Sequence, residues 1–249
     1  MNLLYACSDR LSRQNKRLRS TEGVMEMRRW TTSGGIVIER LNTLRCNCYV
    51  IQYSDAVYLV DTSVVTERQS IERQLKRLGI SGLDGIILTH VHTDHVGNAA
   101  YFQKKFNCLV YVHAHERTAL RDGCCPLPQG TLPFTRKIVS VAGALGVWTC
   151  FEPCRNVMAV ENGQCIGPGI CVLHTPGHTK GSMSLILNED IALVGDAIIH
   201  RSKRIYPPFA NDEVQVKNSL QKLLETNCQQ FLPGHGAAAG REDILSALL

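Results

Sequence analysis

A short run of histidines and one aspartate in the first half of the chain has the composition of a metal-binding loop. The run is Leu88-Thr-His90-Val-His92-Thr-Asp94-His95. Imidazole and carboxylate are the groups that borderline divalent metals prefer as ligands. His90 and His92 stand two residues apart, so in an extended segment both side chains point the same way and can share one metal. Because Asp94 and His95 follow where the chain turns into a helix, the loop can supply ligands to a second metal nearby.

Three later segments carry further metal-capable side chains, at the ends of strands or beside glycines. They are Thr175-Pro-Gly-His178-Thr-Lys-Gly181, Asp196 after the apolar run 191–195, and Leu232-Pro-Gly-His235-Gly236. Glycine lets a backbone turn tightly toward an ion. A lone histidine is more often an ordinary core or surface residue, but together with the first loop these segments make a set large enough for two metals. The candidate metal ligands are His90, His92, Asp94, His95, His178, Asp196 and His235.

The chemistry that such a ligand set supports is hydrolysis. Two metals about 3.5–4 Å apart that share a water lower its pKa and generate hydroxide near neutral pH. The hydroxide attacks a carbonyl or phosphoryl centre while one metal polarises the oxygen that gains charge. Asp94 is the candidate catalytic residue, because a carboxylate beside that water can accept its proton. The sequence therefore predicts an enzyme, a metal-dependent hydrolase that acts on a small molecule and needs no serine or cysteine nucleophile.

The elements that position these ligands are predicted to be short strands alternating with helices. The i, i+4, i+7 spacing of Ile71, Leu75 and Leu78 predicts a helix that Gly79 ends. Strands are expected over Gly35–Glu39, Cys48–Tyr53, Val57–Val60, Gly85–Leu88, Leu109–His113, Ile170–His174, Ser182–Leu187, Ile191–Val194 and Gln230–Leu232. Helices are expected over Thr66–Leu78, Asn98–Phe106, Val214–Leu224 and Arg241–Leu249. This order favours a mixed pair of sheets with helices outside, in one domain over residues 30–249.

A stretch at about residues 121–158 interrupts the alternation. From Arg121 to Val147 it is rich in glycine and proline without a clear hydrophobic period, and we interpret it as a flap or insertion. Phe134, Trp148 and, from a later loop, Tyr206 are the candidate substrate-pocket residues, since aromatic side chains near a site commonly line acyl or ring pockets. The alternative, in which the two flap aromatics only anchor the flap to the core, is equally compatible with the sequence.

The net charge of +5 is concentrated in an N-terminal tail. Residues 1–29 contain seven Lys or Arg against three acidic residues, whereas the remaining 220 residues carry 20 basic and 19 acidic ones. The tail, which we expect to be flexible, has no aromatic interleaving and no base-reading module, so we expect no nucleic-acid partner. No window approaches the ~18 apolar residues of a membrane helix, so we expect no membrane association.

The eleven cysteines do not have the spacing of a structural zinc site. Cys46 and Cys48 are separated by one residue, and Cys124 is adjacent to Cys125, so paired CxxC knuckles are absent. No secretion signal is recognisable. We interpret the cysteines as reduced, mostly buried thiols of an intracellular, cytoplasmic protein.

Taken in order, the motifs resemble those of the metallo-β-lactamase-fold hydrolases. The resemblance rests on the H-x-H-x-D-H loop, the TPGHT segment, Gly195-Asp196 after an apolar strand and the late PGHG, and it spans about residues 34–240. Leu59-Val-Asp61-Thr also looks like the early aspartate motif of that family. The resemblance implies an α/β (α+β) fold: a single-domain, four-layer αββα sandwich with a binuclear metal site at one edge.

The resemblance also assigns roles to the candidate ligands. By position, His90, His92 and His178 would hold the first metal, Asp94, His95 and His235 would hold the second, and Asp196 would bridge the two. Asp61 would orient the ligand loop, which metal-site histidines commonly need. The expected cofactor is a pair of divalent metal ions, with zinc as the first choice, although the same ligands accept manganese or iron.

Departures from known subfamilies narrow the substrate. Only 14 residues follow His235, which argues against the helical glutathione-binding domain of glyoxalase II-like thioesterases. The best-known β-lactamases carry Cys or Ser where Asp196 stands, so hydrolysis of a β-lactam is an alternative and not the expectation. A mononuclear iron, persulfide dioxygenase-like oxidoreductase is the second alternative, although His95 and His235 favour two metals. We expect the substrate to be an ester, lactone or thioester of a small molecule, and the sequence leaves the oligomeric state open.

Overall fold

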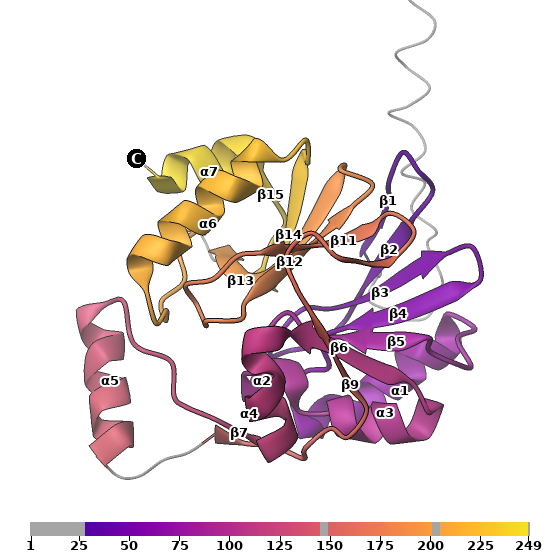
Figure 1. The fold of residues 1–249 in the computed structure, drawn as a ribbon, viewed down its shortest axis with the longest axis horizontal. Coiled ribbons are helices and arrows are strands. Elements are labelled where there is room, and N and C mark those ends of the chain that lie inside the picture. Colours follow the sequence, from indigo (N-terminus) through magenta and orange to yellow (C-terminus); the bar gives the residue numbers. More distant parts are fainter. Residues whose placement is uncertain (1–27, 145–148, 201–204, 249) are drawn as a thin grey trace, which may run out of the picture.

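Two β-sheets face each other at the centre of the molecule (Figure 1). The structure is a computed structural model that describes residues 28–144, 149–200 and 205–248. The first sheet has the strand order β1-β2-β3-β4-β5-β6-β9, and the second has the order β10-β11-β12-β13-β14-β15. The strands of the first sheet are β1 (Arg28–Thr31), β2 (Val37–Leu41), β3 (Cys48–Tyr53), β4 (Ala56–Val60), β5 (Gly85–Ile87), β6 (Leu109–His113) and β9 (Val157–Val160).

The second sheet and a small ribbon complete the β-structure. The second sheet consists of β10 (Cys165–Gly167), β11 (Ile170–His174), β12 (Met183–Leu187), β13 (Ile191–His200), β14 (Gln230–Gly236) and β15 (Ala239–Gly240). The ribbon pairs β7 (Cys124–Cys125) with β8 (Thr149–Cys150). The α-helices are α1 (Arg68–Arg77), α2 (Thr93–Val96), α3 (Ala99–Phe106), α4 (Arg117–Asp122), α5 (Pro133–Ala144), α6 (Glu213–Glu225) and α7 (Arg241–Leu248), and two 3₁₀ turns span Val65–Glu67 and Ala114–Glu116.

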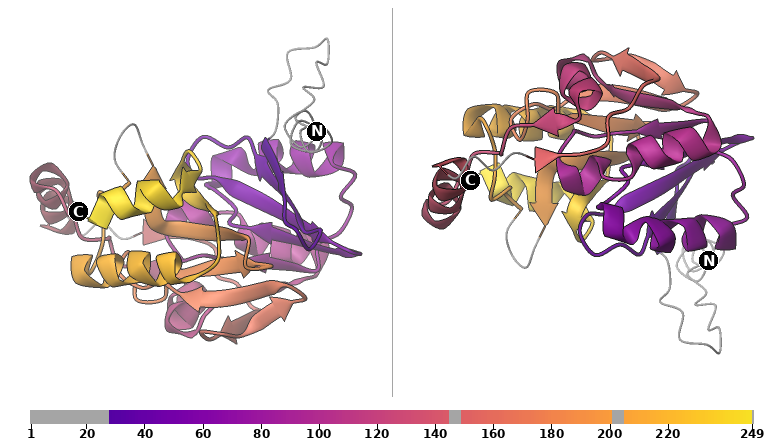
Figure 2. Two further views of the ribbon diagram at one scale, coloured as in Figure 1. Left: turned by 90° about the horizontal axis from the view of Figure 1, so that it is seen from above. Right: turned by 90° about the horizontal axis from the view of Figure 1, so that it is seen from below.

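Three apolar layers hold the sheets and helices together. Ile71 of α1 and Phe102 of α3 are fully buried against the outer face of the first sheet. A second cluster lies between the two sheets, and a third joins the second sheet to α6 and α7, where Leu220 is fully buried. Each such side chain contributes about 1.5–3 kcal/mol by leaving water. Figure 2 shows α6 and α7 over one outer face and α1 and α3 over the other, which is the predicted four-layer αββα sandwich.

Parallel strand pairs at the centre of each sheet set the place of the ligand-bearing segments. In the first sheet β4 and β5 run parallel, with Leu59 opposite Ile86, so the segments after their carboxyl ends emerge at the same edge. In the second sheet β13 and β14 also run parallel, with Leu193 opposite Leu232. The carboxyl ends of parallel strands are the usual location of ligand sites in α/β folds.

Most of the expected strands and helices are present, and the differences have physical causes. β13 and β14 extend beyond their predicted ends because they pair with each other through the ligand region. Arg28 and Arg29 belong to β1, which pairs with β2, so the predicted tail 1–29 extends two residues too far; residues 1–27 lie outside the described ranges. No helix in the described ranges is both long and apolar enough to cross a bilayer.

The stretch that we interpret as a flap contains the helix α5, which was not among the helices expected from the sequence. α5 lies away from both sheets (Figure 1), and Phe134 is 74% exposed on it. Its exposed Phe134, Ile138 and Val141 do have helical spacing, but the glycines and prolines before the helix obscure that pattern. The chain leaves the sandwich for this excursion at β7 and returns to it at β8.

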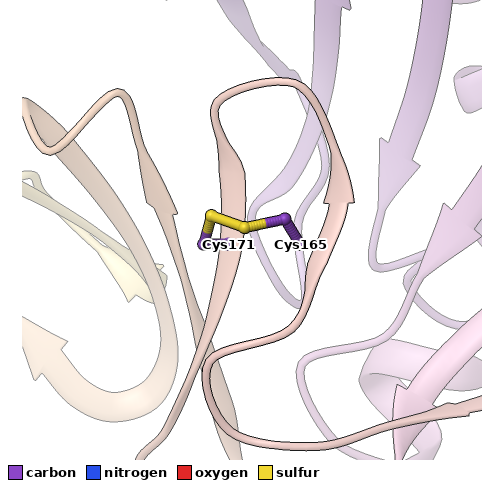
Figure 3. The surroundings of a disulfide bond; sticks show 2 residues. All are labelled: Cys165 and Cys171. Carbon is purple, nitrogen blue, oxygen red and sulfur yellow. A yellow bond between two sulfur atoms is a disulfide. The ribbon is translucent and has the colours of Figure 1, made fainter.

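The expectation that every cysteine is a reduced thiol is wrong for one pair. Cys165 and Cys171 form a disulfide across the antiparallel strands β10 and β11, where the two residues are directly opposite each other (Figure 3). The sequence separation of six residues gave no sign of this pairing, because it depends on the register of the hairpin. Eight further cysteines in the described ranges are free, and all of them except Cys124 and Cys150 are buried.

Candidate metal centre

All seven candidate ligands lie together at one edge of the sandwich. His90 and His92 come from the loop after β5, and Asp94 and His95 from the short helix α2 that follows it. His178 lies between β11 and β12, Asp196 is on β13, and His235 is on β14. Three groups have ligand atoms within 4.8 Å of one another: His90, His92 and His178; His90, His95 and Asp196; and Asp94, His95 and His235.

The first group presents three ring nitrogens to a common point. His92 Nδ1 lies 3.0 Å from His90 Nε2 and 2.8 Å from His178 Nε2. His178 Nδ1 lies 2.8 Å from the backbone carbonyl of Phe209 and must donate to it, so its Nε2 carries a lone pair. Burial lowers the pKa of all three histidines, that of His92 to about 3. The group is therefore neutral near pH 7, as a divalent metal requires.

Thr89 fixes the orientation of His90. It was not among the candidate site residues expected from the sequence. Its hydroxyl donates to Asp61 Oδ2 over 2.8 Å, so its oxygen is left to accept from His90 Nδ1 at 3.1 Å. Its backbone amide donates to Asp61 Oδ1 over 2.9 Å. This chain of contacts leaves His90 Nε2 unprotonated and directed at His92. The signal in the sequence was only its place directly before the first ligand.

Asp61 also holds the second group. Its Oδ2 accepts from His95 Nδ1 over 2.8 Å, which turns His95 Nε2 toward His235 Nε2 at 3.3 Å. Asp94 Oδ2 lies 3.3 Å from His235 Nε2. Asp61 itself is 1% exposed and has a left-handed backbone with φ of 56°, a strained conformation that its three side-chain hydrogen bonds offset.

The two groups differ in charge. Burial alone would lower the pKa of His95 and His235, but neighbouring carboxylates, chiefly Asp196, raise the pKa of His95 to about 9 and that of His235 to about 10. Burial would likewise raise the pKa of Asp94 and Asp196, but the imidazoles of His95 and His235 lower it in both. Without metal, the protonated imidazoles of His95 and His235 therefore balance the negative charges of Asp94 and Asp196.

Asp196 reaches both groups. Its Oδ2 lies 3.5 Å from His178 Nε2 and 3.4 Å from His235 Nε2, and its Oδ1 lies 3.4 Å from His95 Nε2. Oδ1 is buried and has no hydrogen-bond partner among the described residues, a costly state for a carboxylate oxygen that a cation would relieve. A Cβ on Gly234 would lie 2.3 Å from this oxygen, so the close approach of β14 requires glycine. The residues present thus fit a pair of divalent metals.

A cavity of about 440 Å³ opens onto the ligands. Its outer walls include Leu44, Arg45, Pro128, Thr149, Pro208 and Phe209. Two of the three predicted pocket residues do not line it: Phe134 lies exposed on α5, and the hydroxyl of Tyr206 donates to the carbonyl of Glu213 over 3.3 Å. Trp148 lies outside the described ranges. The walls come instead from Pro128, Thr149, Pro208 and Phe209, which lie near the predicted residues along the chain, and from Leu44 and Arg45 after β2.

Two polar side chains fix the rim segment that carries Leu44 and Arg45. The carboxylate of Glu67 accepts from the backbone amides of both, at 2.6 Å and 3.4 Å. Asn47 donates through its side chain to the carbonyls of Pro233 and Gly236, at 2.8 Å and 3.1 Å, on the strand that carries His235. The rim is therefore tied to the metal centre, a link between distant segments that no local motif indicates.

The remaining histidines of the chain are outside the three ligand groups. His113 is buried and accepts a hydrogen bond from the backbone amide two residues later. His174 and His200 each donate a ring N–H to a backbone carbonyl, at 2.9 Å and 3.2 Å, and His115 is exposed. Among the described residues, none of these four histidines belongs to a group that could hold a metal ion.

Metal loading should depend on pH in two steps. His90, His92 and His178 are already unprotonated, whereas His95 and His235 must each release a proton because their pKa values are raised to about 9 and about 10. Between about pH 6 and pH 8 we expect the apparent affinity for the second metal to rise by about tenfold per pH unit for each proton released, with little change for the first. Calorimetric zinc titrations in buffers of different ionisation enthalpy would count the protons, and equal pH dependence of both steps would contradict the assignment.

Replacing Asp61 should weaken the second metal most. The Asp61 carboxylate now accepts three hydrogen bonds. In Asp61→Asn the side-chain NH₂ group would face one of these donors instead of accepting from it, so His95 would lose its fixed orientation. We expect the affinity for the second metal to fall by about 10- to 100-fold. Metal content after dialysis against a weak chelator would measure the effect, with Asp55→Asn on an exposed turn as the matched control. Unchanged retention of both metals in Asp61→Asn would refute this role.

Comparison with known proteins agrees with this geometry. A family model described as the metallo-beta-lactamase superfamily matches residues 41–124, which include the loop with His90 and His92. A probable metallo-hydrolase of Methanocaldococcus jannaschii is 26% identical over 189 residues, 74% of this chain and 84% of that protein. An uncharacterized protein of Mycobacterium leprae is 30% identical over 207 residues, 78% of this chain and 87% of that protein.

The fold itself is shared with solved structures. The crystal structure of TTHA1623 in a di-iron-bound form superposes with a TM-score of 0.62, covering 84% of this chain and 96% of that one at 23% identity. At this identity the likeness shows the fold. With the family model and the relative at 30% identity, it shows that the chain belongs to the metallo-β-lactamase superfamily.

Proposed function

We propose that the protein is a metal-dependent hydrolase that uses two divalent metals to cleave an ester, lactone or thioester of a small molecule. The observation that carries this proposal is the buried Asp196 carboxylate, which lies 3.4–3.5 Å from histidines of both ligand groups and has one oxygen without a hydrogen-bond partner among the described residues. The relative in Methanocaldococcus jannaschii, named as a metallo-hydrolase, supports the reaction class.

The ligand groups suggest how the metals would be held. His90, His92 and His178 would bind the first metal, Asp94, His95 and His235 the second, and Asp196 would reach both. Bound there, divalent metals supply Lewis acidity and lower the pKa of a coordinated water. Imidazole with carboxylate suits zinc first and also accepts manganese or iron. Because a similar structure is described as di-iron-bound, iron should be included among the metals that are measured in this protein.

Asp94 has the properties of a proton acceptor. Its carboxylate lines the cavity. Although burial would raise its pKa, the imidazoles of His95 and His235 lower it, so the group is ionised at neutral pH. An ionised carboxylate at this position can take a proton from an attacking water and pass it to a leaving group. His235, 3.3 Å from Asp94 Oδ2, holds the carboxylate in place.

The cavity suggests a substrate with an apolar part and a negative charge. Its volume of about 440 Å³ suits a small molecule. Leu44, Ile199 and Phe209 give it apolar wall for an acyl group, and Arg45 is the only lysine or arginine among the described residues that line it. A guanidinium at a cavity rim pairs well with a carboxylate or phosphate.

The decisive test combines metal analysis with a substrate panel. The purified protein should contain about two metals per chain and hydrolyse a lactone, ester or S-lactoylglutathione in preference to a β-lactam or phosphodiester. Asp196→Ala should lose the second metal and at least about 100-fold in kcat, because even residues that only orient metal ligands can cost that much. Asp55→Asn is again the control. A single iron per chain with oxygen consumption on a persulfide, and no hydrolysis, would overturn the proposal.

The role of Arg45 can be tested separately from the chemistry. Arg45→Gln should raise KM by about twofold to fivefold for an acyl substrate that carries a carboxylate, the range expected for one partly exposed ion pair. The kcat for both substrates, and the KM for the methyl ester of the same substrate, should stay unchanged. Arg45 is not among the groups proposed to move a proton or bind a metal, and the ester has no charge for it to pair with. Lys76→Gln on the exposed face of α1 is the matched control. A KM increase of the same size for both substrates would show that Arg45 does not read the charge.

A further inference from the structure

A second feature of the molecule, outside the metal centre, is a pair of cysteines in the β7–β8 ribbon. Cys124 and Cys150 are directly opposite each other in this antiparallel pair, and their Sγ atoms are 3.0 Å apart. The separation is about 1 Å longer than a disulfide bond of about 2.0 Å, so bond formation needs only small side-chain movements. Both residues are free cysteines in the structure.

Exposure distinguishes this pair from the other free cysteines in the described ranges. Cys150 is exposed and Cys124 is partly exposed, whereas the other six are buried. Cys125 and Cys154, the neighbours of the pair along the chain, are 4% and 2% exposed. Burial raises the pKa of their thiols to about 11 and about 12, so they are poor nucleophiles at neutral pH. A reagent in solution therefore meets Cys150 first and Cys124 next.

The β7–β8 ribbon joins the two ends of the chain segment that carries α5. We call this segment between β7 and β8 the excursion, and the ribbon at its base the neck. On the side of the sandwich, the amide of Phe151 donates to the carbonyl of Gly123 over 2.8 Å, and the amide of Cys154 donates to that of Leu120 over 3.2 Å. These bonds join the neck to the end of α4. On the opposite side, Pro128 and Thr149 line the cavity above the metal ligands.

The same excursion contacts the backbone that orients a metal ligand. The amide of Thr131 donates to the carbonyl of Pro208 over 3.0 Å, and the amide of Ala210 donates to the carbonyl of Gln129 over 2.8 Å. Between these two contacts, the carbonyl of Phe209 accepts from His178 Nδ1. A constraint on the neck is therefore passed to one wall of the cavity within a few residues.

We propose that Cys124 and Cys150 are a reversible dithiol–disulfide site that reacts with low-molecular-weight disulfides. When oxidised, the site cross-links the two strands of the neck, and we call this cross-link the staple. With glutathione disulfide, the Cys150 thiolate attacks one sulfur, forms a mixed disulfide and releases one glutathione thiolate. The Cys124 thiolate then attacks Cys150 Sγ and releases the second. The two protein thiols give up two electrons and two protons, and glutathione disulfide is reduced to two glutathione molecules.

The order of the two steps follows from the environment of the sulfurs. The pKa of the Cys124 thiol is raised, first by its hydrogen bond with Cys150 and then by burial. Cys124 thus stays protonated while the exposed Cys150 reacts, and it loses this hydrogen bond once Cys150 carries glutathione. The closed bond would span 26 positions of the chain, a length at which a cross-link restricts the open states of a loop strongly.

The experiment exposes the full, metal-loaded chain to increasing glutathione disulfide, blocks remaining thiols with an alkylating reagent and maps tryptic peptides. We expect a cross-link between the peptides of residues 122–136 and 138–155, reversed by dithiothreitol. It should be lost in Cys124→Ser and Cys150→Ser and kept in Cys125→Ser and Cys154→Ser, which are matched controls within the same two peptides. A circular dichroism spectrum and a thermal unfolding midpoint equal to those of the unmodified chain would show that each variant is folded.

A second measurement tests the staple. Oxidation should slow tryptic cleavage after Arg136 in α5 by at least about threefold in the unmodified chain and leave the rate unchanged in Cys150→Ser. A stable glutathione adduct on Cys150 without a cross-link, or a cross-link that depends on Cys125 or Cys154, would overturn the assigned pair. An unchanged cleavage rate in the cross-linked chain would overturn the staple. Neither measurement depends on the hydrolase activity, so the two proposals can fail separately.

Discussion

The buried carboxylate of Asp61 organises the metal centre, because its two oxygens accept the donors that fix ligands of both groups. One oxygen takes the Thr89 amide, and the other takes the Thr89 hydroxyl and His95 Nδ1. Through Thr89 the same charge reaches His90. A single anion thereby turns the Nε2 atoms of two imidazoles, those of His90 and His95, toward the other candidate ligands. The parallel pairing of β4 with β5 makes this possible, since it brings the segment after each strand to the same edge.

Electrostatic asymmetry is the second property of the centre. The histidines of the first group are neutral through burial, whereas His95 and His235 are surrounded by carboxylates that raise their pKa. In the proposed binding of two metals, the first group would accept a cation as it stands, and the second would have to release protons first. Asp196 lies close to histidines of both groups, so a cation bound at one of them would change the charge experienced by the other.

That the candidate ligands lie together could be predicted from the sequence because their signals are local. His90 and His92 have the spacing of an extended loop, and His178 and His235 follow glycines that permit close approach of the backbone. The cavity walls could not be predicted in this way. Arg45 is placed by Glu67, which is distant in sequence, and Phe134 is exposed on α5, which lies away from both sheets. The strands and helices with a buried face were predictable, whereas α5 and the disulfide of Cys165 depend on long-range placement and hairpin register.

The parallel ladder between β13 and β14 has a consequence for how such a protein can diversify. The ladder pairs Gly195 with Pro233 and Ile199 with His235, on either side of an irregularity that contains Asp196, so strand pairing brings Asp196 and His235 near each other. That connection supplies Pro208 and Phe209 to the cavity wall. Substitutions of side chains in the connection can therefore remodel the wall, as long as the backbone carbonyl of Phe209 still accepts from His178 Nδ1. Mutations in the part of this connection that lines the cavity could in this way change which substrates fit beside the same metal centre.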